Sequence, residues 1–221
     1  MGRCMKTSKT LLVTRPNYDP TTRYCYYWSQ PVIDKAKQKT FRVLDITDDK
    51  VTKLTLESYL KKQEPQLLFF NGHGSPTVLT GQNDELLLTK DNLHILPTDA
   101  IIYIRSCDVG AILGVQIAQK VSAFIGYSKA FGFYRDYRYM RDPTSDPLAK
   151  FSFEPSNLVV TTLLKGKTVL EAHQRSRSAM RKNIEYLLSS KATSIERQCA
   201  MPLWRNYKHQ VLLGNREAYI A

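Results

Sequence analysis

The sequence predicts an α/β domain with a mostly parallel sheet of about six strands and helices on both faces. Short apolar runs alternate along the chain with segments of helical periodicity, which is typical of such sheets. The runs at 66–71, 100–106 and 122–128 are almost wholly apolar, as expected for central strands that are buried on both faces. Hydrophobic residues make up 43% of the 221 residues and charged residues 24%, so we expect one packed domain over residues 1–221.

Each element follows from a local signal. The apolar run over 9–16 ends at a proline and predicts the first strand. A helix is expected to begin at Asp19 and Pro20, because proline suits the first helical position. Pro31 should break or kink this helix. The next elements, in order, are a strand over 41–46, a helix over 51–62, the strands at 66–71 and 100–106, a helix over 110–121 and the strand at 122–128.

The last third of the chain has a different pattern. A helix is expected over 153–166, where a glycine ends it, and a longer helix over 168–190. The longer helix has an apolar stripe of Val169, Ala172, Ser176, Met180, Ile184 and Leu187. A final strand or hairpin is expected over 209–220. Between the two halves, the loop at about 129–148 is polar and contains glycine and proline, so we expect it to be exposed and cleavable.

A histidine lies at the end of the third predicted strand. Residues 67–79, "LLFFNGHGSPTVL", run from four large apolar residues into Asn-Gly-His-Gly. The glycines predict a turn where the strand ends. In open sheets of this kind, functional sites form at the carboxyl ends of the strands. We therefore expect His73 to present its imidazole at the edge of a cleft, although a polar turn residue with no catalytic role would give the same pattern.

A cysteine lies at the end of the fourth predicted strand, in "IIYIRSCDVGAILG". A helix is expected directly after Cys107, and the positive end of its dipole would favour the thiolate, which is the nucleophilic form. Because the third and fourth strands should be neighbours, His73 and Cys107 would face the same cleft. The amide of Gly74 would then be free to bind an oxyanion. A buried, inert cysteine is the alternative.

These two motifs, "FFNGHGS" and "YIRSCDVGA", resemble those of the caspase-like clan CD cysteine peptidases. The clan includes caspases, metacaspases, legumain, gingipains, separase and the CHAT proteases. The spacing of His73 and Cys107 is 107 − 73 = 34 residues, shorter than the roughly 50 typical of caspases. The first strand and helix, and the closing "HQVLLGNREAYI", are most similar to bacterial gingipain-like and CHAT-like members, although Asn215 replaces a more usual Asp.

The resemblance implies a three-layer caspase-like fold and a cysteine-type endopeptidase. It assigns Cys107 as the nucleophile and His73 as the general base or acid. The amides of Gly74 and Cys107 would form the oxyanion hole. This clan requires no third catalytic residue, and either Asn71 or a backbone carbonyl would orient the imidazole. The chemistry implies neither a cofactor nor a metal, and the cysteines and histidines of the sequence have no zinc-ligand spacing.

The residue two positions before the cysteine lines the substrate pocket in several members of the clan. Here it is Arg105, which should point to the same side as Cys107 because strand residues alternate. A buried guanidinium is expected to need a carboxylate. An acidic substrate side chain could supply it, or the protein could, from Asp108 or from the loop that contains Asp136. We expect a preference for basic substrates, with acidic ones as the alternative.

The loop at about 129–148 suggests a means of activation. Caspase relatives are often activated by a cut on the carboxyl side of the cysteine, so we expect processing between Tyr134 and Pro147. A plain substrate-binding loop is the alternative. The expected partners are protein substrates, with an activating protease or a regulatory subunit as further possibilities.

The formal net charge of +12 allows a different class of function. The basic segment 173–183 could bind nucleic acid, but basic residues are spread along the whole chain and no nucleic-acid-binding motif is present. Nucleic acid is therefore not expected as a partner, and a basic nucleic-acid-binding or pseudo-protease interaction module is the alternative function. The sequence contains neither an apolar run long enough to cross a membrane nor a signal-peptide pattern, so we expect a cytoplasmic protein.

Overall fold

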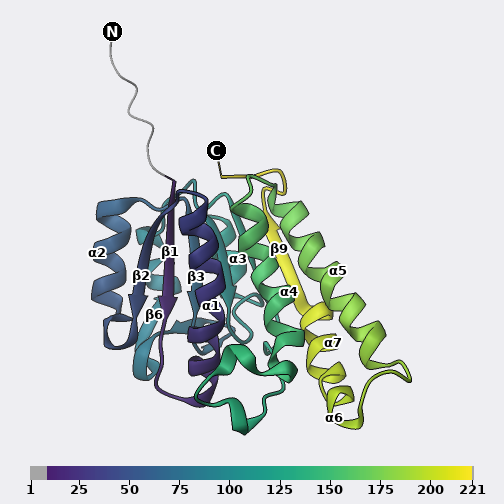
Figure 1. The fold of residues 1–221 in the computed structure, drawn as a ribbon. Helices are drawn as coiled ribbons and strands as arrows, with labels where there is room; N and C mark the ends of the chain where they lie inside the picture. The colour runs from purple at the N-terminus through teal and green to yellow at the C-terminus, as the bar shows by residue number, and fades with distance from the viewer. Residues whose placement is uncertain (1–8, 221) are drawn as a thin grey trace.

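The computed structural model describes residues 9–220, and a six-stranded sheet forms its centre (Figure 1). Neighbouring strands in the sheet are parallel except for the last pair, which is antiparallel. The mostly parallel sheet expected from the sequence is therefore confirmed. Across the sheet the strands are β2 (Arg42–Thr47), β1 (Thr10–Arg15), β3 (Leu67–Asn71), β7 (Ile101–Arg105), β8 (Ala123–Tyr127) and β9 (Gln210–Gly214).

Helices cover both faces of the sheet, as expected. One core cluster joins the sheet to α1 (Pro20–Gln38), α4 (Pro147–Leu163), α5 (Val169–Leu187) and α7 (Ala200–His209). The other cluster joins it to α2 (Lys53–Gln63) and α3 (Leu113–Ala118). A short helix, α6 (Ser194–Arg197), precedes α7. None of the helices in residues 9–220 has the length and apolar character needed to cross a membrane.

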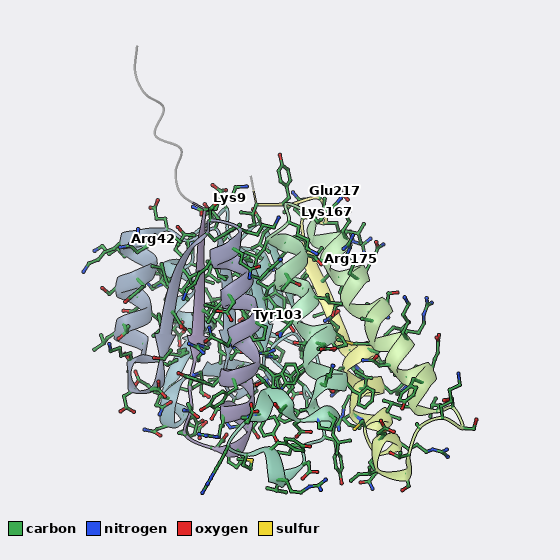
Figure 2. The ribbon with its side chains drawn as sticks, in the orientation of Figure 1. Lys9, Arg42, Tyr103, Lys167, Arg175 and Glu217 are labelled. Carbon is green, nitrogen blue, oxygen red and sulfur yellow. The ribbon has the colours of Figure 1, made fainter. Side chains whose placement is uncertain are left out.

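Side-chain direction follows the strand alternation. Leu11, Phe69 and Tyr103 belong to the core under α1 and α4, whereas Leu12 and Phe70 belong to the core under α2 and α3. Figure 2 shows Tyr103 in the middle of the molecule, with Lys9 and Arg42 at the edge where β1 and β2 begin. The carboxyl ends of the parallel strands lie at the opposite, lower edge in this view.

A second, three-stranded antiparallel sheet follows His73 directly. Its strands are β4 (Gly74–Ser75), β5 (Val78–Thr80) and β6 (Leu86–Thr89). The sequence did not predict it, because strands of two to four residues show no periodicity. Short 3₁₀ segments complete the structure at Asp48–Lys50, Gln82–Asp84, Lys90–Ile95, Tyr137–Tyr139 and Pro143–Ser145.

The structure differs from the sequence predictions at two helices. The helix α1 continues through Pro31, so the expected break is absent. Pro31 lies on the exposed side of the helix, where water can bond the carbonyl group that the proline ring leaves without a partner. The helix α4 begins at Pro147 rather than at 153, because the carboxylate of Asp146 accepts hydrogen bonds from the amides of Leu148 and Ala149. The buried stripe of α5 is the one predicted.

The loop between β8 and α4 is less exposed than expected. Asp146 is fully buried, and its Oδ2 accepts hydrogen bonds from the Tyr24 hydroxyl at 2.7 Å and from the Asp136 amide at 2.8 Å. The Trp28 indole donates to the Pro143 carbonyl at 2.8 Å. The loop is therefore anchored against α1 at several points, with exposed residues between them.

Candidate active site

The strand register brings the predicted histidine and cysteine to one edge of the sheet. Strands β3 and β7 are parallel neighbours, and Asn71 pairs with Arg105 at their last position. His73 and Cys107 each lie two residues further along the chain. They therefore leave adjacent strands at the same carboxyl edge, where the sequence predicted a shared cleft.

Two glycines allow the backbone on either side of His73 to pack closely against neighbouring segments. A Cβ atom at Gly72 would lie 2.0 Å from the carbonyl oxygen of Thr80, within the small sheet. A Cβ atom at Gly74 would lie 2.4 Å from Ser106 Oγ and 2.9 Å from the carbonyl oxygen of Cys107. Real Cβ contacts are never this short, so only glycine fits at either position. The backbone after His73 thus packs directly against the turn that carries Cys107.

His73 has a carboxylate partner that the sequence did not predict. Its Nε2 lies 2.5 Å from Oδ2 of Asp19, and the two side chains are 35% and 30% exposed. Asp19 was predicted only as the start of α1, a role it also has, because its Oδ1 accepts from the Thr22 amide. Asn71 does not orient the imidazole, since its amide nitrogen donates to the Thr14 carbonyl instead.

Asp19 is held in its charged form. Burial favours the neutral carboxyl, but hydrogen bonds from the Thr22 amide and from His73 outweigh it, so the pKa of Asp19 lies below its ordinary value. Asp19 is therefore a carboxylate at neutral pH and accepts a proton-bearing Nε2. The assignment leaves Nδ1 of His73 as the nitrogen that can take up a further proton.

The segment before Asp19 is fixed from the small sheet. The Asn17 amide donates to Gln82 Oε1 at 2.9 Å, and the Tyr18 hydroxyl donates to Asp84 Oδ1 at 2.7 Å. The Tyr18 ring also meets the His73 ring edge to face, with 6.0 Å between centroids. The residues between β4 and β6 therefore position the carboxylate as well as the imidazole.

Cys107 sits at a tight turn. The Val109 amide donates to the Cys107 carbonyl at 2.7 Å, which closes a three-residue turn centred on Asp108. Asp108 has φ of 59°, a left-handed conformation that aspartate adopts more readily than most residues. The thiol is half-buried. The following helix, α3, begins only at Leu113.

The environment of Cys107 does not favour the thiolate, contrary to the expectation from the helix dipole. Burial raises the pKa of Cys107, and the nearby charge of Asp108 raises it further. A hydrogen bond from the Phe131 amide and the charge of Arg205 lower it, but by less. The expectation failed because α3 is short and starts well beyond Cys107. Cys107 is therefore a thiol at neutral pH until a base removes its proton.

Arg105 lies outside the cleft, and its predicted role in substrate binding is wrong. Its side chain is 1% exposed and bonds Asn71 Oδ1, Asn157 Oδ1, Ser29 Oγ and the Cys25 carbonyl, at 2.8 to 3.1 Å. The guanidinium also lies 4.9 Å from the centroids of two phenylalanine rings. Neutral oxygens and ring faces thus take the place of the expected carboxylate, and a substrate could reach Arg105 only by opening the core.

Asp136 is also engaged elsewhere. Its carboxylate pairs with Arg138 at 2.5 Å and accepts from the Arg138 amide, and these bonds hold its pKa below the ordinary value. Of the residues predicted for the site, the structure therefore brings together His73, Gly74, Cys107 and Asp108, but neither Arg105 nor Asp136.

The helix α7 holds the loop after β8 beside Cys107, and the sequence did not predict this helix. Asn206 is 1% exposed and clamps one residue of the loop after β8: its Oδ1 accepts from the Gly132 amide at 2.8 Å, and its Nδ2 donates to the Gly132 carbonyl at 2.6 Å. The preceding residue, Phe131, donates its amide to the Cys107 thiol. In residues 9–220, no group of three or more His, Cys, Asp or Glu side chains is arranged to hold a metal ion.

A six-stranded, mostly parallel sheet of this order with helices on both faces is a caspase-like α/β fold. Solved structures of proteinases share it. The structure of gingipain R (RgpB), an Arg-specific cysteine proteinase, matches over 96% of this chain and 47% of its own, with 10% identity and a TM-score of 0.65. The complex of Porphyromonas gingivalis RgpB pro- and mature domains matches over 96% and 48%, with 10% identity and a TM-score of 0.62. A further structure, described only as a protease, matches over 97% and 48%, with 15% identity and a TM-score of 0.51.

These matches confirm the caspase-like fold expected from the motifs. At 10 to 15% identity they establish the fold and nothing finer. The chain spans about half the length of each of these proteins. No protein-family model and no curated protein matches the sequence.

Proposed function

We propose that this chain is a cysteine endopeptidase in which Cys107 is the nucleophile, His73 the general base and acid, and Asp19 the residue that orients His73. The observation that carries the proposal is the bonded pair of His73 and Asp19, placed beside the strand whose terminal turn presents Cys107. An oriented imidazole next to a thiol is the arrangement that cysteine nucleophiles require.

The chemistry follows from the proton positions. Asp19 holds the proton on Nε2 of His73, so Nδ1 accepts the proton of the Cys107 thiol. The thiolate attacks the scissile carbonyl carbon, and the imidazolium then donates its proton to the leaving amine as the C–N bond breaks. Water, deprotonated by His73, cleaves the resulting thioester and restores the thiol. The raised pKa of Cys107 makes this base necessary.

The oxyanion would lie between the amides of Gly74 and Cys107. The Thr80 amide donates to the His73 carbonyl. The facing residues Gly74 and Leu79 are therefore a non-hydrogen-bonded pair of the antiparallel ladder. That pairing does not use the Gly74 amide. The close packing of Gly74 on the Cys107 backbone supports the two amides pointing at one oxygen atom.

A positional-scanning library of fluorogenic peptides tests the proposal. We expect hydrolysis by the natural sequence and none by Cys107→Ala or His73→Ala. A matched control is His94→Ala, which changes a histidine remote from the cleft on the 3₁₀ segment before β7. Activity that survives in Cys107→Ala, or no hydrolysis of any peptide by the folded natural sequence, would reject the function.

The same peptide library measures which residue is preferred immediately before the cleaved bond. We propose a basic side chain, bound by the carboxylate of Asp108 next to the nucleophile. The alternative is an acidic side chain bound by Arg205, which lies beside Gly132 and close enough to Cys107 to lower its pKa. Asp108→Asn should weaken cleavage after Arg and Lys, whereas Arg205→Ala should weaken cleavage after Asp and Glu if the alternative holds.

We also propose self-processing between Tyr134 and Pro147. Arg138 and Arg141 are exposed there and fit a basic preference, although the flanking residues are anchored. Comparison of intact masses of the natural sequence and Cys107→Ala tests this, and identical masses would reject it.

The two alternative functions are less well supported. A pseudo-protease platform has no need of a carboxylate that orients an imidazole, yet Asp19 is in place. The basic residues are spread along the whole chain, and Lys167, just before α5, is already paired with Glu171 at 3.2 Å, which weakens the case for nucleic acid. The regulatory partner, the bacterial origin and the cytoplasmic location remain predictions from the sequence.

A further inference from the structure

An apolar hollow lies on the outer surface between α5 and α7. It has a volume of about 470 Å³ and is lined by Ile184, Leu188, Arg197, Ala200, Met201 and Trp204. Leu188 is 72% exposed, Met201 71% and Trp204 49%. Large apolar side chains gathered in one exposed hollow are typical of interaction sites, and Trp and Met are enriched in such sites.

A basic hollow of about 410 Å³ lies between the same helices and the end of the chain after β9. Its lining includes Arg177, Arg181 and Arg216 together with His173 and Tyr207, and no acidic residue lines it. Arg181 and Arg216 are exposed, and Arg181 also lies 3.7 Å from the carboxylate of Glu185 in a surface ion pair. A surface of this kind attracts negatively charged groups.

Stacked side chains lie between the two neighbouring hollows, which we together call the α5–α7 groove. The Trp204 and Tyr207 rings, one turn apart on α7, stack with 5.7 Å between centroids. The Arg177 guanidinium lies 4.1 Å from the centroid of Tyr207 and comes from α5. Figure 1 shows α5 and α7 side by side beyond β9, along the edge of the domain. The groove is therefore apolar at the α6 end and basic toward β9.

We propose that this α5–α7 groove binds a segment of a partner protein in which apolar residues adjoin acidic ones. The apolar half requires a partner that buries hydrocarbon, and the basic half selects carboxylates, so charge and apolar character are both complementary. A nucleic-acid strand fits less well, because phosphates would find a single cation, Arg197, over the apolar half and the faces of Trp204 and Tyr207 already stack on each other.

The opposite side of α7 faces the candidate active site. Asn206 clamps Gly132, and Pro202 lies against the same glycine, in the loop that bonds Cys107. A segment held in the groove would thus lie one helix away from the cleft, where it would tether a substrate protein or stabilise the loop. The docking itself does not depend on the proposed peptidase activity.

Selection from a phage-displayed library of random 16-residue peptides tests the proposal. The immobilised protein is the full chain with Cys107→Ala, so that cleavage cannot remove bound peptide. Selected peptides are then made synthetically and titrated by tryptophan fluorescence. The chain has two tryptophans, and Trp28 is only 4% exposed, so a change in emission on binding reports Trp204.

We expect the selected peptides to carry a run of apolar residues next to Asp or Glu. Met201→Asp should weaken their binding by about tenfold or more, as should the pair Arg181→Glu and Arg216→Glu. Leu54→Asp is the matched control, because Leu54 is 78% exposed on the remote α2, and it should leave binding unchanged. Equal thermal unfolding of the variants verifies that the fold is intact.

Three results would overturn the proposal. One is a selection that yields no shared pattern, and another is peptide binding that the groove variants leave unchanged. The third is a single-stranded 20-nucleotide DNA that binds with sensitivity to Arg181→Glu while no peptide does, which would assign the groove to nucleic acid.

Discussion

Nε2 of His73 lies 2.5 Å from Oδ2 of Asp19, although the two residues are 54 positions apart in the chain. The contact joins the loop after β1 to the loop after β3, so a polar contact connects the ends of these two neighbouring strands. It fixes the tautomer of the imidazole and its orientation. Without it, the proposed chemistry would depend on a histidine that is free to rotate.

Replacing Asp19 by Asn should lower kcat/KM roughly tenfold to a thousandfold, because the amide cannot hold the proton on Nε2 or stabilise the imidazolium. Asn still caps α1, so the thermal midpoint should change little. Peptide hydrolysis across a pH series measures the effect. Asp34→Asn, on the exposed side of the same helix, serves as the control and should be silent. Equal activity of the two variants would show that Asp19 has no role in catalysis.

The raised pKa of Cys107 predicts slow alkylation at neutral pH. The thiolate is the reactive form, so a folded pKa above the ordinary value of about 8.5 means that the rate rises steadily between pH 7 and 9. Mass spectrometry of the peptide containing Cys107, after timed exposure to iodoacetamide, measures this rate. Fast alkylation that is independent of pH between 6 and 8 would show a preformed thiolate instead.

Gly74→Ala should abolish activity while the domain still folds. The new methyl group would meet Ser106 Oγ and the Cys107 carbonyl, so the two turns must separate, at a cost of about 1 to 3 kcal/mol of stability. Denaturant unfolding and peptide hydrolysis measure the two effects. Ser75→Ala, in the same short strand, is the control. A Gly74→Ala variant with full activity would contradict the packing described.

Arg105→Met should destabilise the fold rather than change specificity. The substitution leaves Asn71, Asn157 and Ser29 without their donor in a buried site, at a cost of about 1 to 3 kcal/mol for each group that stays unsatisfied. The midpoint of urea unfolding should fall, and any remaining activity should keep its preference among peptides. A variant with normal stability and an altered preference among peptides would show instead that Arg105 contributes to substrate binding.

The fold class and half of the site were predictable from local patterns. The apolar runs of β3, β7 and β8 indicated central strands, and glycines beside His73 indicated a turn at a strand end. Neighbouring parallel strands then brought Cys107 to the same edge. These inferences rest on periodicity and on glycine geometry, which a single sequence displays directly.

The remaining features depend on contacts between distant segments. Asp19 has the pattern of an ordinary helix cap, and nothing local reveals its second partner. The alternation of side chains along β7 predicted which face of the sheet Arg105 points to. It could not predict that residues of α1 and α4 bury Arg105 there. The helix α7 has no side-chain cap to mark its start, and only two of its residues, Leu203 and Asn206, are buried.

The most direct measurement is covalent labelling of the folded chain by a peptidyl acyloxymethyl ketone, followed by mapping of the adduct. We expect one adduct, on the sulfur of Cys107, with labelling strongly reduced in His73→Ala and slowed in Asp19→Asn. An unlabelled chain, or equal labelling of Cys107 with and without His73, would contradict the pairing of thiol and imidazole.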